Sequence, residues 1–584
     1  MRSFFKVFFA CLLALFVAGF LSVMVLFGIA ASVGSSEKPV VSKQTVLTID
    51  LGSYVAEQGR EEDLNPTSLS FEATMGLRDL VGAIHHAIGD SLVKAIYLNC
   101  SGNQLGMASG RELGVALDSF KAAGKPVIAF TDMMPQRAYA IAHRASHLYM
   151  QPGGVFEWSG LFVEVVFFKN LLDRLAIKPE VFYAGRFKSA TEPFRLTKMS
   201  DANRAQYQAI IDEAYRQMVV SIGKHRGIDS AALTGLANSL AVRTAEQALQ
   251  HGLIDGVKYD DEVKDTLKAL IGLSKKEDIN FMPALKYIEA TRSSGTGDRI
   301  AIVYADGNIV DGKGEDGEIG GDSFRKMLAG IRSDDKVKAV VLRVNSPGGS
   351  AIASEMIWRE LSLLRKEKPL VVSMGNYAAS GGYYISCVAD SIFAQPNTLT
   401  GSIGVFSLLF DAKQLFNDKL GITFDLVATN TYSDFGNLAR PMTEFEKQVA
   451  QRDVDSIYAT FKQRVMQGRG LDAGVVDSIA QGRVWSGTHG LAIGLVDHIG
   501  GLHDALACAA RMAKLKTFAT REYPRHRTIL DKILSPQDKE DSKSISLLEK
   551  GLPPRQAAWV KGYRSFAQMA NVPQARLPFI VQFP

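Results

Sequence analysis

The sequence predicts an α/β protein that contains two copies of one domain, each built on a mainly parallel sheet. Segments with the composition of buried strands alternate with segments of helical spacing, which is typical of parallel sheets covered by helices. Several short motifs recur at one constant separation, which indicates a duplication. A single long apolar run near the N-terminus predicts one helix across a membrane ahead of the two domains.

The apolar run covers residues 7–31 and contains no charged residue. About 20 apolar residues are enough to cross a bilayer as a helix. Arg2 and Lys6 precede the run, so we expect the N-terminus in the cytoplasm and the rest of the chain on the other side. Residues 30–32, Ala-Ala-Ser, leave cleavage as a signal peptide open. The run is longer than the core of a signal peptide, which favours an uncleaved anchor within residues 1–44.

Three apolar motifs recur 244 residues further along the chain (338 − 94 = 244), which predicts two homologous halves. The motifs begin at Lys94 and Lys338, at Tyr149 and Phe393, and at Gly160 and Gly404. We expect the halves to cover residues 45–292 and 299–520. The Ser, Gly and Thr residues of 293–297 predict a flexible join, and residues 521–584 form a C-terminal extension with a polar loop at 535–543.

Each half is expected to begin with a strand, at residues 46–49 and at 300–304. In the second half, residues 336–344 (KVKAVVLRV) predict a buried strand. Residues 352–364 have helical spacing, and residues 370–374 predict the next strand. This order of elements predicts strands that pair in parallel through helical crossovers.

The net charge and the positions of the cysteines argue against nucleic-acid binding, a structural zinc site and a disulfide framework. The formal net charge is +5 and no block of Lys and Arg is long enough for a nucleic-acid surface, so no nucleic-acid partner is expected. The four cysteines, Cys11, Cys100, Cys387 and Cys508, lie far apart and form no CxxC pair. They predict unpaired thiols and neither a structural zinc site nor a disulfide framework.

Ser380 lies among small residues in the segment 376–384, directly after a predicted strand. A hydroxyl on such a turn is open to attack a carbonyl group, and the N–H of Gly381 lies beside it. Serine is also a common N-cap of a helix, and this alternative stays open. The G-x-S-x-G elbow of α/β-hydrolases is absent around Ser380.

A second turn, residues 345–350, carries the glycine pair Gly348 and Gly349 between a predicted strand and a predicted helix. Backbone N–H groups of such a turn can hold the oxyanion of an acyl-transfer reaction. Glycines are also frequent in strand-to-helix turns without any catalytic role, so this motif alone does not establish an oxyanion hole.

A serine nucleophile needs a base, and no histidine occurs between His251 and His489. Lys188 offers an alternative, because its neighbours include Phe187, Ala190 and Phe194. Burial in an apolar site lowers the pKa of a lysine and makes its neutral amine available as a base. An ordinary surface lysine with apolar neighbours is the competing interpretation.

The duplication separates the two candidate groups. At the offset of 244 residues, Lys188 corresponds to Tyr432, Ser380 to Gln136, and the glycine pair to Gln104 and Leu105. The first half has the lysine but lacks the serine and the glycine pair, and the second half has these but lacks the lysine. This division predicts one composite site per chain, while a site shared between neighbouring chains stays open.

Four motifs closely resemble the signal peptide peptidase A (protease IV) family, serine peptidase family S49, in its long 67K-type duplicated form. They are Ala379-Ser-Gly-Gly-Tyr383, Asn345-Ser-Pro-Gly-Gly349, Leu399-Thr-Gly-Ser-Ile-Gly404 and Phe187-Lys-Ser-Ala-Thr-Glu-Pro193. The resemblance covers about residues 45–515. It implies tandem Clp protease/crotonase-like domains behind one transmembrane helix.

The resemblance also implies a Ser/Lys dyad, with Ser380 as nucleophile and Lys188 as general base. Ser402 would help to orient the lysine, and Gly381 with Gly349 or Gly348 would form the oxyanion hole. No cofactor or metal is implied.

The implied activity is that of a membrane-bound serine endopeptidase, which degrades cleaved signal peptides and other apolar peptides at the periplasmic face of the bacterial inner membrane. A ring-like or bowl-like homo-oligomer, in the first instance a tetramer, is implied as well. Two other functions stay open: a catalytically silent membrane scaffold, and a crotonase-like acyl-CoA enzyme that would need neither Ser380 nor Lys188.

Overall fold

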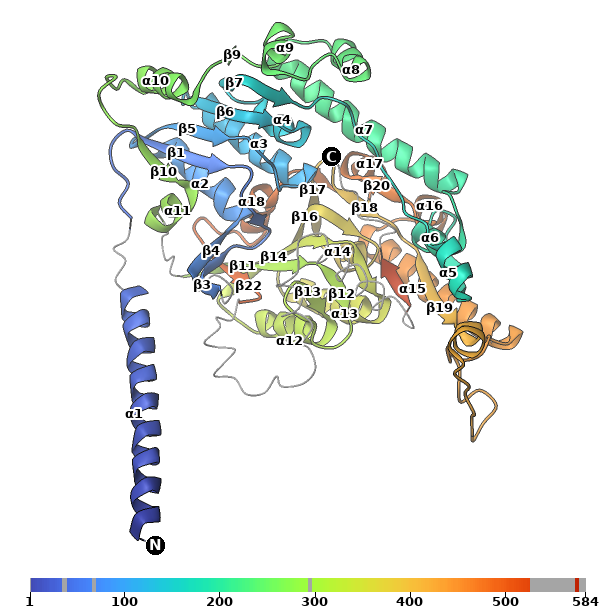
Figure 1. Cartoon of the computed structure of the whole chain (residues 1–584). Helices are drawn as coiled ribbons and strands as arrows, with labels where there is room; N and C mark the ends of the chain where they lie inside the picture. The colour runs from blue at the N-terminus through green and yellow to red at the C-terminus, as the bar shows by residue number, and fades with distance from the viewer. Residues whose placement is uncertain (1, 34–38, 66–69, 292–296, 526–572, 577–584) are drawn as a thin grey trace.

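The computed structural model describes residues 2–33, 39–65, 70–291, 297–525 and 573–576. Two parallel sheets covered by helices form most of the body, and a third sheet contains strands from both halves of the chain (Figure 1). The expected α/β architecture is therefore confirmed. The predicted flexible join falls almost wholly outside the described residues, and the predicted loop 535–543 falls outside them completely.

The first sheet is built from the first half of the chain. Its order is β10-β1-β5-β6-β7-β9, and every neighbouring pair is parallel. Its strands are β1 (Thr45–Asp50), β5 (Val93–Asn99), β6 (Val127–Met134), β7 (His147–Phe156), β9 (Gly256–Val257) and β10 (Asn280–Pro283). Its helices are α2 (Leu77–Gly89), α3 (Met107–Ala122), α4 (Gln136–Ala142), α7 (Asp201–Arg226), α8 (Ser230–Ser239), α9 (Ala245–Gln250), α10 (Asp260–Ile271) and α11 (Ala284–Thr291).

The second sheet repeats this topology, because the order β22-β11-β14-β16-β17-β21 is again parallel throughout. These strands are β11 (Arg299–Asp306), β14 (Val337–Ser346), β16 (Leu370–Ala379), β17 (Ser391–Ala394), β21 (His498–Ile499) and β22 (Ala519–Tyr523). Strands β18 (Leu399–Gly401) and β20 (Val484–Ser486) extend the sheet from β16. The helices of this half are α12 (Gly321–Arg332), α13 (Ala351–Glu367), α14 (Gly381–Ser386), α15 (Glu444–Arg469), α16 (Ala473–Ile479), α17 (Gly487–Ala492) and α18 (Leu502–Met512).

Individual elements show the duplication too. The strands expected at 46–49, 300–304, 336–344 and 370–374 are found in β1, β11, β14 and β16, and the expected helix at 352–364 is α13. Helices α7 and α15 are both 26 residues long. Each begins after a hydroxyl N-cap, Ser200 or Thr443, and each ends at a glycine with positive φ, Gly227 or Gly470.

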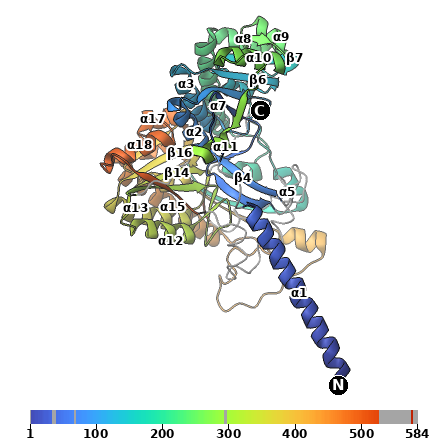
Figure 2. The ribbon, with the colours of Figure 1, turned by 90° about the vertical axis from the view of Figure 1, so that its left-hand side faces the viewer.

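Helix α1 (Arg2–Val33) extends away from the body in both views (Figures 1 and 2). Its described side chains, at residues 6–10, 12–21 and 24, are exposed. Within the part of the chain that the structure describes, no helix meets the length and apolarity needed to cross a membrane. The membrane anchor expected at residues 7–31 therefore stays a prediction.

The third sheet joins the two halves. Its order is β13-β12-β15-β23-β19-β8. The strands are β8 (Lys178–Ala184), β12 (Asn308–Val310), β13 (Glu318–Gly320), β15 (Gly348–Ser350), β19 (Val405–Asp411) and β23 (Gln574–Arg576). Strand β8 of the first half pairs with β19 of the second half in an antiparallel ladder from Ala184↔Val405 to Lys178↔Asp411. A three-stranded sheet of β2 (Val55–Ala56), β3 (Arg60–Asn65) and β4 (Ser70–Gly76) lies apart from these.

A buried ion network also connects the halves. Arg343 of β14 is 1% exposed, and its guanidinium donates to Glu57 (2.8 Å) and to Glu112 (2.7 Å), which both belong to the first half. The same guanidinium donates to Ser373 at 2.9 Å. The two carboxylates are themselves buried, so each charge in this network depends on its partners.

We therefore expect Arg343→Ala to destabilise the protein by about 3–5 kcal/mol, because it leaves two buried carboxylates without their counterion. A matched control is Arg365→Ala, which removes a partly exposed pair with Asp390 and is expected to cost at most about 1 kcal/mol. Urea unfolding followed by far-UV circular dichroism measures both. An Arg343→Ala loss no larger than that of the control contradicts the assigned role of the network.

Candidate active site

Ser380 lies on a sharp turn between β16 and the short helix α14. Its φ of 54° is in the left-handed region, which is uncommon for a residue with a side chain. Ser380 occupies the N-cap position, yet its side chain makes no capping hydrogen bond to the described backbone of α14. The helix-cap interpretation is therefore not supported, because the hydroxyl points to other partners.

Lys188 reaches the site from the end of β8. The chain leaves β8 at Ala184, and Lys188 precedes a short 3₁₀ turn, Ser189–Thr191. The side chain of Lys188 is 1% exposed. Ala190 and Phe194, two of the apolar neighbours expected from sequence, belong to a buried cluster with Phe406 of β19. The interpretation of Lys188 as a surface lysine is therefore wrong.

The lysine amine and the serine hydroxyl meet within one chain. Nζ of Lys188 lies 2.8 Å from Oγ of Ser380, although 192 positions separate the two residues in sequence. Nζ is also 3.2 Å from Oγ of Ser402 and 3.2 Å from its carbonyl oxygen. The hydroxyl of Ser380 has the carbonyl oxygen of Gly404 as a second partner at 3.5 Å. The structure thus brings together Lys188 and Ser380, which were selected from the residues, and Ser402, which the resemblance implied.

Burial lowers the pKa of the Lys188 ammonium well below its ordinary value of 10.5. The cause is desolvation, since the side chain is cut off from water. The partners described for Nζ are two hydroxyls and a carbonyl oxygen, all uncharged. A neutral amine at this position can take up a proton, which a lysine in water does not do at neutral pH.

The loop 481–483 fixes both sides of this contact. The carbonyl of Gln481 accepts from the Phe187 N–H (2.7 Å), and the carbonyl of Arg483 accepts from the Ser402 N–H (2.7 Å). Gly482 lies so close to the Lys188 backbone that a Cβ on Gly482 would be 2.7 Å from the Lys188 backbone nitrogen. The φ of Gly482 is +72°. This loop could not be predicted from the sequence, because its only local signal is a single glycine.

Two of the three glycines selected as oxyanion donors, Gly348 and Gly381, lie against each other. A Cβ placed on Gly348 would be 2.7 Å from the amide nitrogen of Gly381. The N–H of Gly348 itself donates to the hydroxyl of Ser346 at 3.1 Å. Gly348 therefore shapes the space next to Gly381, while its own N–H is already engaged. Gly381 and Gly349 are the remaining amides of this group.

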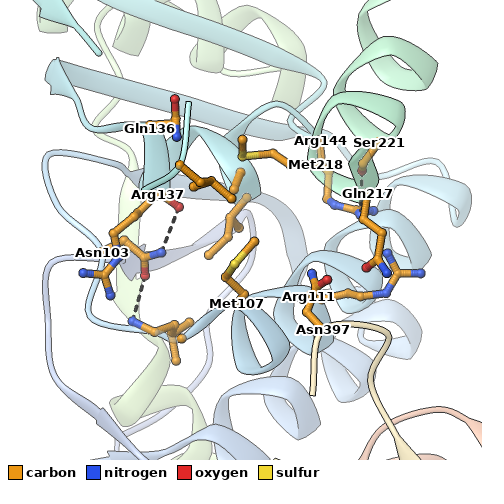
Figure 3. Close-up of a pocket in the computed structure, with 16 residues that line it drawn as sticks. Asn103, Met107, Arg111, Gln136, Arg137, Arg144, Gln217, Met218, Ser221 and Asn397 are labelled. Carbon is orange, nitrogen blue, oxygen red and sulfur yellow. Dashed lines mark hydrogen bonds between the residues drawn. The ribbon is translucent and has the colours of Figure 1, made fainter. Parts of the chain in front are cut away.

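The corresponding place in the first half lacks the serine–lysine pair. Gln136 begins α4 where Ser380 precedes α14, and its side-chain amide accepts from the Gly160 N–H and donates to the Gly160 carbonyl, both at 2.9 Å. It lies at the edge of a pocket of about 70 Å³ that contains Arg111 and Arg144 (Figure 3). None of the described residues that line this pocket is a lysine.

Two further features next to the site were missed. Asn376 of β16 accepts from the Ala108 N–H and donates to the Ser109 hydroxyl, and so attaches the site to α3 of the first half. Strand β23 belongs to the C-terminal extension, whose role the sequence left open. A strand of three residues has no periodicity that could have revealed it.

Comparison with known proteins gives relatives over most of the chain. Peptidase family S49 matches twice, over residues 119–274 and 362–516. Protease 4 of Salmonella typhi is 36% identical over 78% of this chain and 75% of its own length. Protease 4 of Haemophilus influenzae is 34% identical over 83% and 82%. The chloroplastic serine protease SPPA of Arabidopsis thaliana is 28% identical over 85% and 73%.

Among solved structures, a ClpP1 mutant from Listeria monocytogenes covers 35% of this chain and 94% of its own, at 15% identity. Its TM-score of 0.24 is too low to establish a shared fold, so the expected likeness to Clp protease stays a prediction. The double family match agrees with the duplicated topology of the two parallel sheets. On this evidence the chain belongs to peptidase family S49.

Proposed function

We propose that the protein is a serine endopeptidase in which Lys188 activates Ser380 of the same chain. The observation that carries this proposal is the 2.8 Å contact between a fully buried amine and a buried hydroxyl on a strained turn. The relatives named Protease 4 and serine protease SPPA support the same reaction class.

The first half of the cycle forms an acyl-enzyme. Neutral Lys188 takes the proton of the Ser380 hydroxyl while Oγ attacks a peptide carbonyl carbon. The negative charge that develops on the carbonyl oxygen is stabilised by the backbone N–H groups of Gly381 and Gly349. Lys188 then gives its proton to the departing nitrogen, the C–N bond breaks, and the amine product leaves.

The second half of the cycle hydrolyses the ester. A water molecule gives a proton to Lys188 and attacks the acyl carbon, and the proton returns to Ser380 Oγ as the C–O bond breaks. Ser402 acts as a positioning residue, because its hydroxyl and its carbonyl oxygen both lie 3.2 Å from the lysine Nζ. These contacts hold the amine against Ser380 in either protonation state of the cycle.

The two rival functions do not account for this arrangement. A silent scaffold has no use for a buried amine, whose desolvation is costly. An acyl-CoA enzyme of the crotonase type would use glycine amides but would need neither Ser380 nor Lys188. Both residues are buried in mutual contact, at a turn with an unfavourable φ, which favours the peptidase.

We further propose that the substrates are apolar peptides, including cleaved signal peptides, presented at the periplasmic face of the inner membrane. Apolar side chains of α1 that point to solvent support a membrane location, among them Phe16 (75% exposed) and Leu15 (73%). Burying such residues in lipid would be favourable. In this proposal α1 anchors the body from its N-terminal side, with the N-terminus in the cytoplasm.

A homo-oligomer, with four subunits as the first expectation, is part of the proposal. The segment between β19 and α15 projects from the body (Figure 1) and exposes Phe424 (56%), Leu426 (56%) and Val427 (98%). Exposed apolar patches of this kind mark contact surfaces. For the domains we keep the boundaries 45–292, 299–520 and 521–584 as part of the proposal; strand β22 (Ala519–Tyr523), at the edge of the second sheet, crosses the last of them.

Ser380→Ala is expected to lower peptidase activity by about 10⁴-fold or more, because it removes the nucleophile. Ser391→Ala is the matched control, since it also removes one buried hydroxyl, and that hydroxyl has no partner within the described residues. Hydrolysis of a fluorogenic apolar peptide measures the activity, and far-UV circular dichroism shows that both variants remain folded. A folded Ser380→Ala variant with the activity of the control would rule out the assignment.

The activity of the wild-type protein is expected to rise with pH, because Lys188 acts as base only after it has lost its proton. Below the lowered pKa, kcat/KM should rise by about tenfold per pH unit and should level off before the ordinary lysine value of 10.5. Lys188→Met should be inactive at every pH, and so should Lys188→Arg, because arginine does not deprotonate. Lys178→Met, on the exposed end of β8, should keep the wild-type profile. A flat wild-type profile would contradict a titrating base.

A further inference from the structure

The pocket of about 70 Å³ in the first half lies beside Gln136, the residue that corresponds to Ser380. Helices α3, α4 and α7 form its walls, and Asn397 reaches it from the loop after β17 of the second half (Figure 3). The described residues that line it include Arg111 and Arg144 but no acidic residue. We call it the arginine pocket.

The two arginines differ in their partners. Arg144 pairs with Asp118, and its guanidinium also donates to the hydroxyl of Ser221 at 3.0 Å. Arg111 makes no hydrogen bond or ion pair with any described residue. Burial, and then the nearby charge of Arg144, lower the pKa of the Arg111 guanidinium. A bound anion would offset both effects, because it stabilises the charged form of the arginine.

Two side-chain oxygens at the same pocket also lack partners. Oε1 of Gln217 and Oδ1 of Asn397 are buried and accept no hydrogen bond from any described residue. The Gln217 amide cannot turn over freely, because its Nε2 donates to Glu213 at 2.6 Å and to Thr488 at 3.1 Å. Both oxygens lie on the same side of the pocket as Arg111 (Figure 3). Buried polar atoms nearly always have a partner, so these oxygens indicate a ligand that carries an N–H donor.

The second half of the chain fills the corresponding place with its own side chains. Arg464 of α15 forms an ion pair with Glu355 of α13 at 2.5 Å. The hydroxyl of Tyr384, in α14, donates to the same carboxylate at 2.6 Å. Tyr384 is 2% exposed, so its ring occupies the interior between these helices. Charge and volume are therefore both matched within the second half.

The first half has replaced all three of these residues. The offset is 244 for α3 and α4, and the N-caps of α7 and α15 differ by 243 (443 − 200 = 243). The corresponding residues are Arg111, Ala140 and Ser221 (355 − 244 = 111, 384 − 244 = 140, 464 − 243 = 221). Alanine and serine leave open the space that tyrosine and arginine take in the other half. Arginine in place of glutamate leaves a positive charge there without a counterion.

We propose that the arginine pocket binds the carboxylate of an α-amino-acid unit together with the N–H next to it, as both occur at the C-terminus of a peptide. The guanidinium of Arg111 binds the carboxylate through two parallel hydrogen bonds. The oxygens of Gln217 and Asn397 accept the N–H, and Met107 and Met218 contact a small side chain. The volume admits one terminal residue, and a free amino acid carries the same groups.

Inorganic phosphate fits this set of groups less well, because its oxygens would face the oxygens of Gln217 and Asn397. The inference goes beyond the proposed peptidase function. It assigns a binding role to the half of the chain that lacks the serine nucleophile.

The test is a ligand-observed NMR titration of the full-length Ser380→Ala variant, which cleaves no peptide, so the result does not depend on the peptidase function. Acetyl-trialanine with a free carboxylate is expected to bind. Its C-terminal amide, and the acid with a methyl group on the last peptide nitrogen, should each bind at least about tenfold more weakly, because each loses a hydrogen bond to a buried group. Free alanine separates the two sources: it binds more weakly than the tripeptide acid at a site for peptide C-termini, and at least as tightly at a site for amino acids.

Two further substitutions in the Ser380→Ala protein place the binding in the pocket. Arg111→Gln removes the charge and Ala140→Tyr fills the space, as the tyrosine of the second half does. Each is expected to weaken binding of the tripeptide acid by at least about tenfold. Arg359→Gln and Ala232→Tyr, at exposed positions of α13 and α8, are the matched controls and should leave the dissociation constant unchanged. Far-UV circular dichroism shows which variants are folded.

Three results overturn the inference and leave the peptidase function untouched. The first is equal binding of the acid and its amide, or binding of neither the acid nor free alanine. The second is a dissociation constant that stays the same in folded Arg111→Gln. The third is inorganic phosphate that binds as tightly as the tripeptide acid and with the same dependence on Arg111, because the pocket would then recognise any anion.

Discussion

The antiparallel ladder between β8 and β19 determines the geometry of the site. Because Ala184 pairs with Val405, the chain that leaves β8 and the chain that enters β19 meet at the same end of the ladder. Lys188 follows β8 by four positions, and Ser402 precedes β19 by three. A slip of one residue in this pairing would turn every side chain to the opposite face and would separate the amine from the hydroxyls. The proposed composite site therefore depends on both halves of the duplicated chain.

The site is held at a free-energy cost that the rest of the fold must offset. Ser380 and Ser402 both have positive φ, at 54° and 50°, and each such residue costs roughly 1–3 kcal/mol. In the folded protein the Lys188 amine contacts two hydroxyls and a carbonyl oxygen instead of water, which favours its neutral form. The buried Arg343 network and the contacts of Asn376 tie the halves together close to these strained turns. This arrangement is suited to a site whose parts come from distant segments of sequence.

Much of this could be predicted because the relevant signals are local or periodic. The strands at 46–49 and 300–304 follow from composition, and the constant offset between Lys94 and Lys338 indicates the duplication. Ser380 and Lys188 could be selected because their neighbours are unusual and because the other half lacks each of them. The β8–β19 pairing, the Arg343 network and the insertion of β23 could not be predicted, because each joins residues far apart in sequence with no motif of its own. The strand predicted at 370–374 extends to Ala379 in β16, because its last residues pair with the distant strand β18.

The central claim is that Lys188 is uncharged when it meets Ser380. Its most direct test is an NMR titration of the protein with ¹⁵Nζ- and ¹³Cε-labelled lysine, with the Lys188 signals assigned by comparison with Lys188→Met. The account predicts that Lys188 loses its proton at a pH well below the 10.5 of an ordinary lysine, while exposed lysines titrate normally. A Lys188 amine that stays protonated until its ordinary pKa would contradict the account.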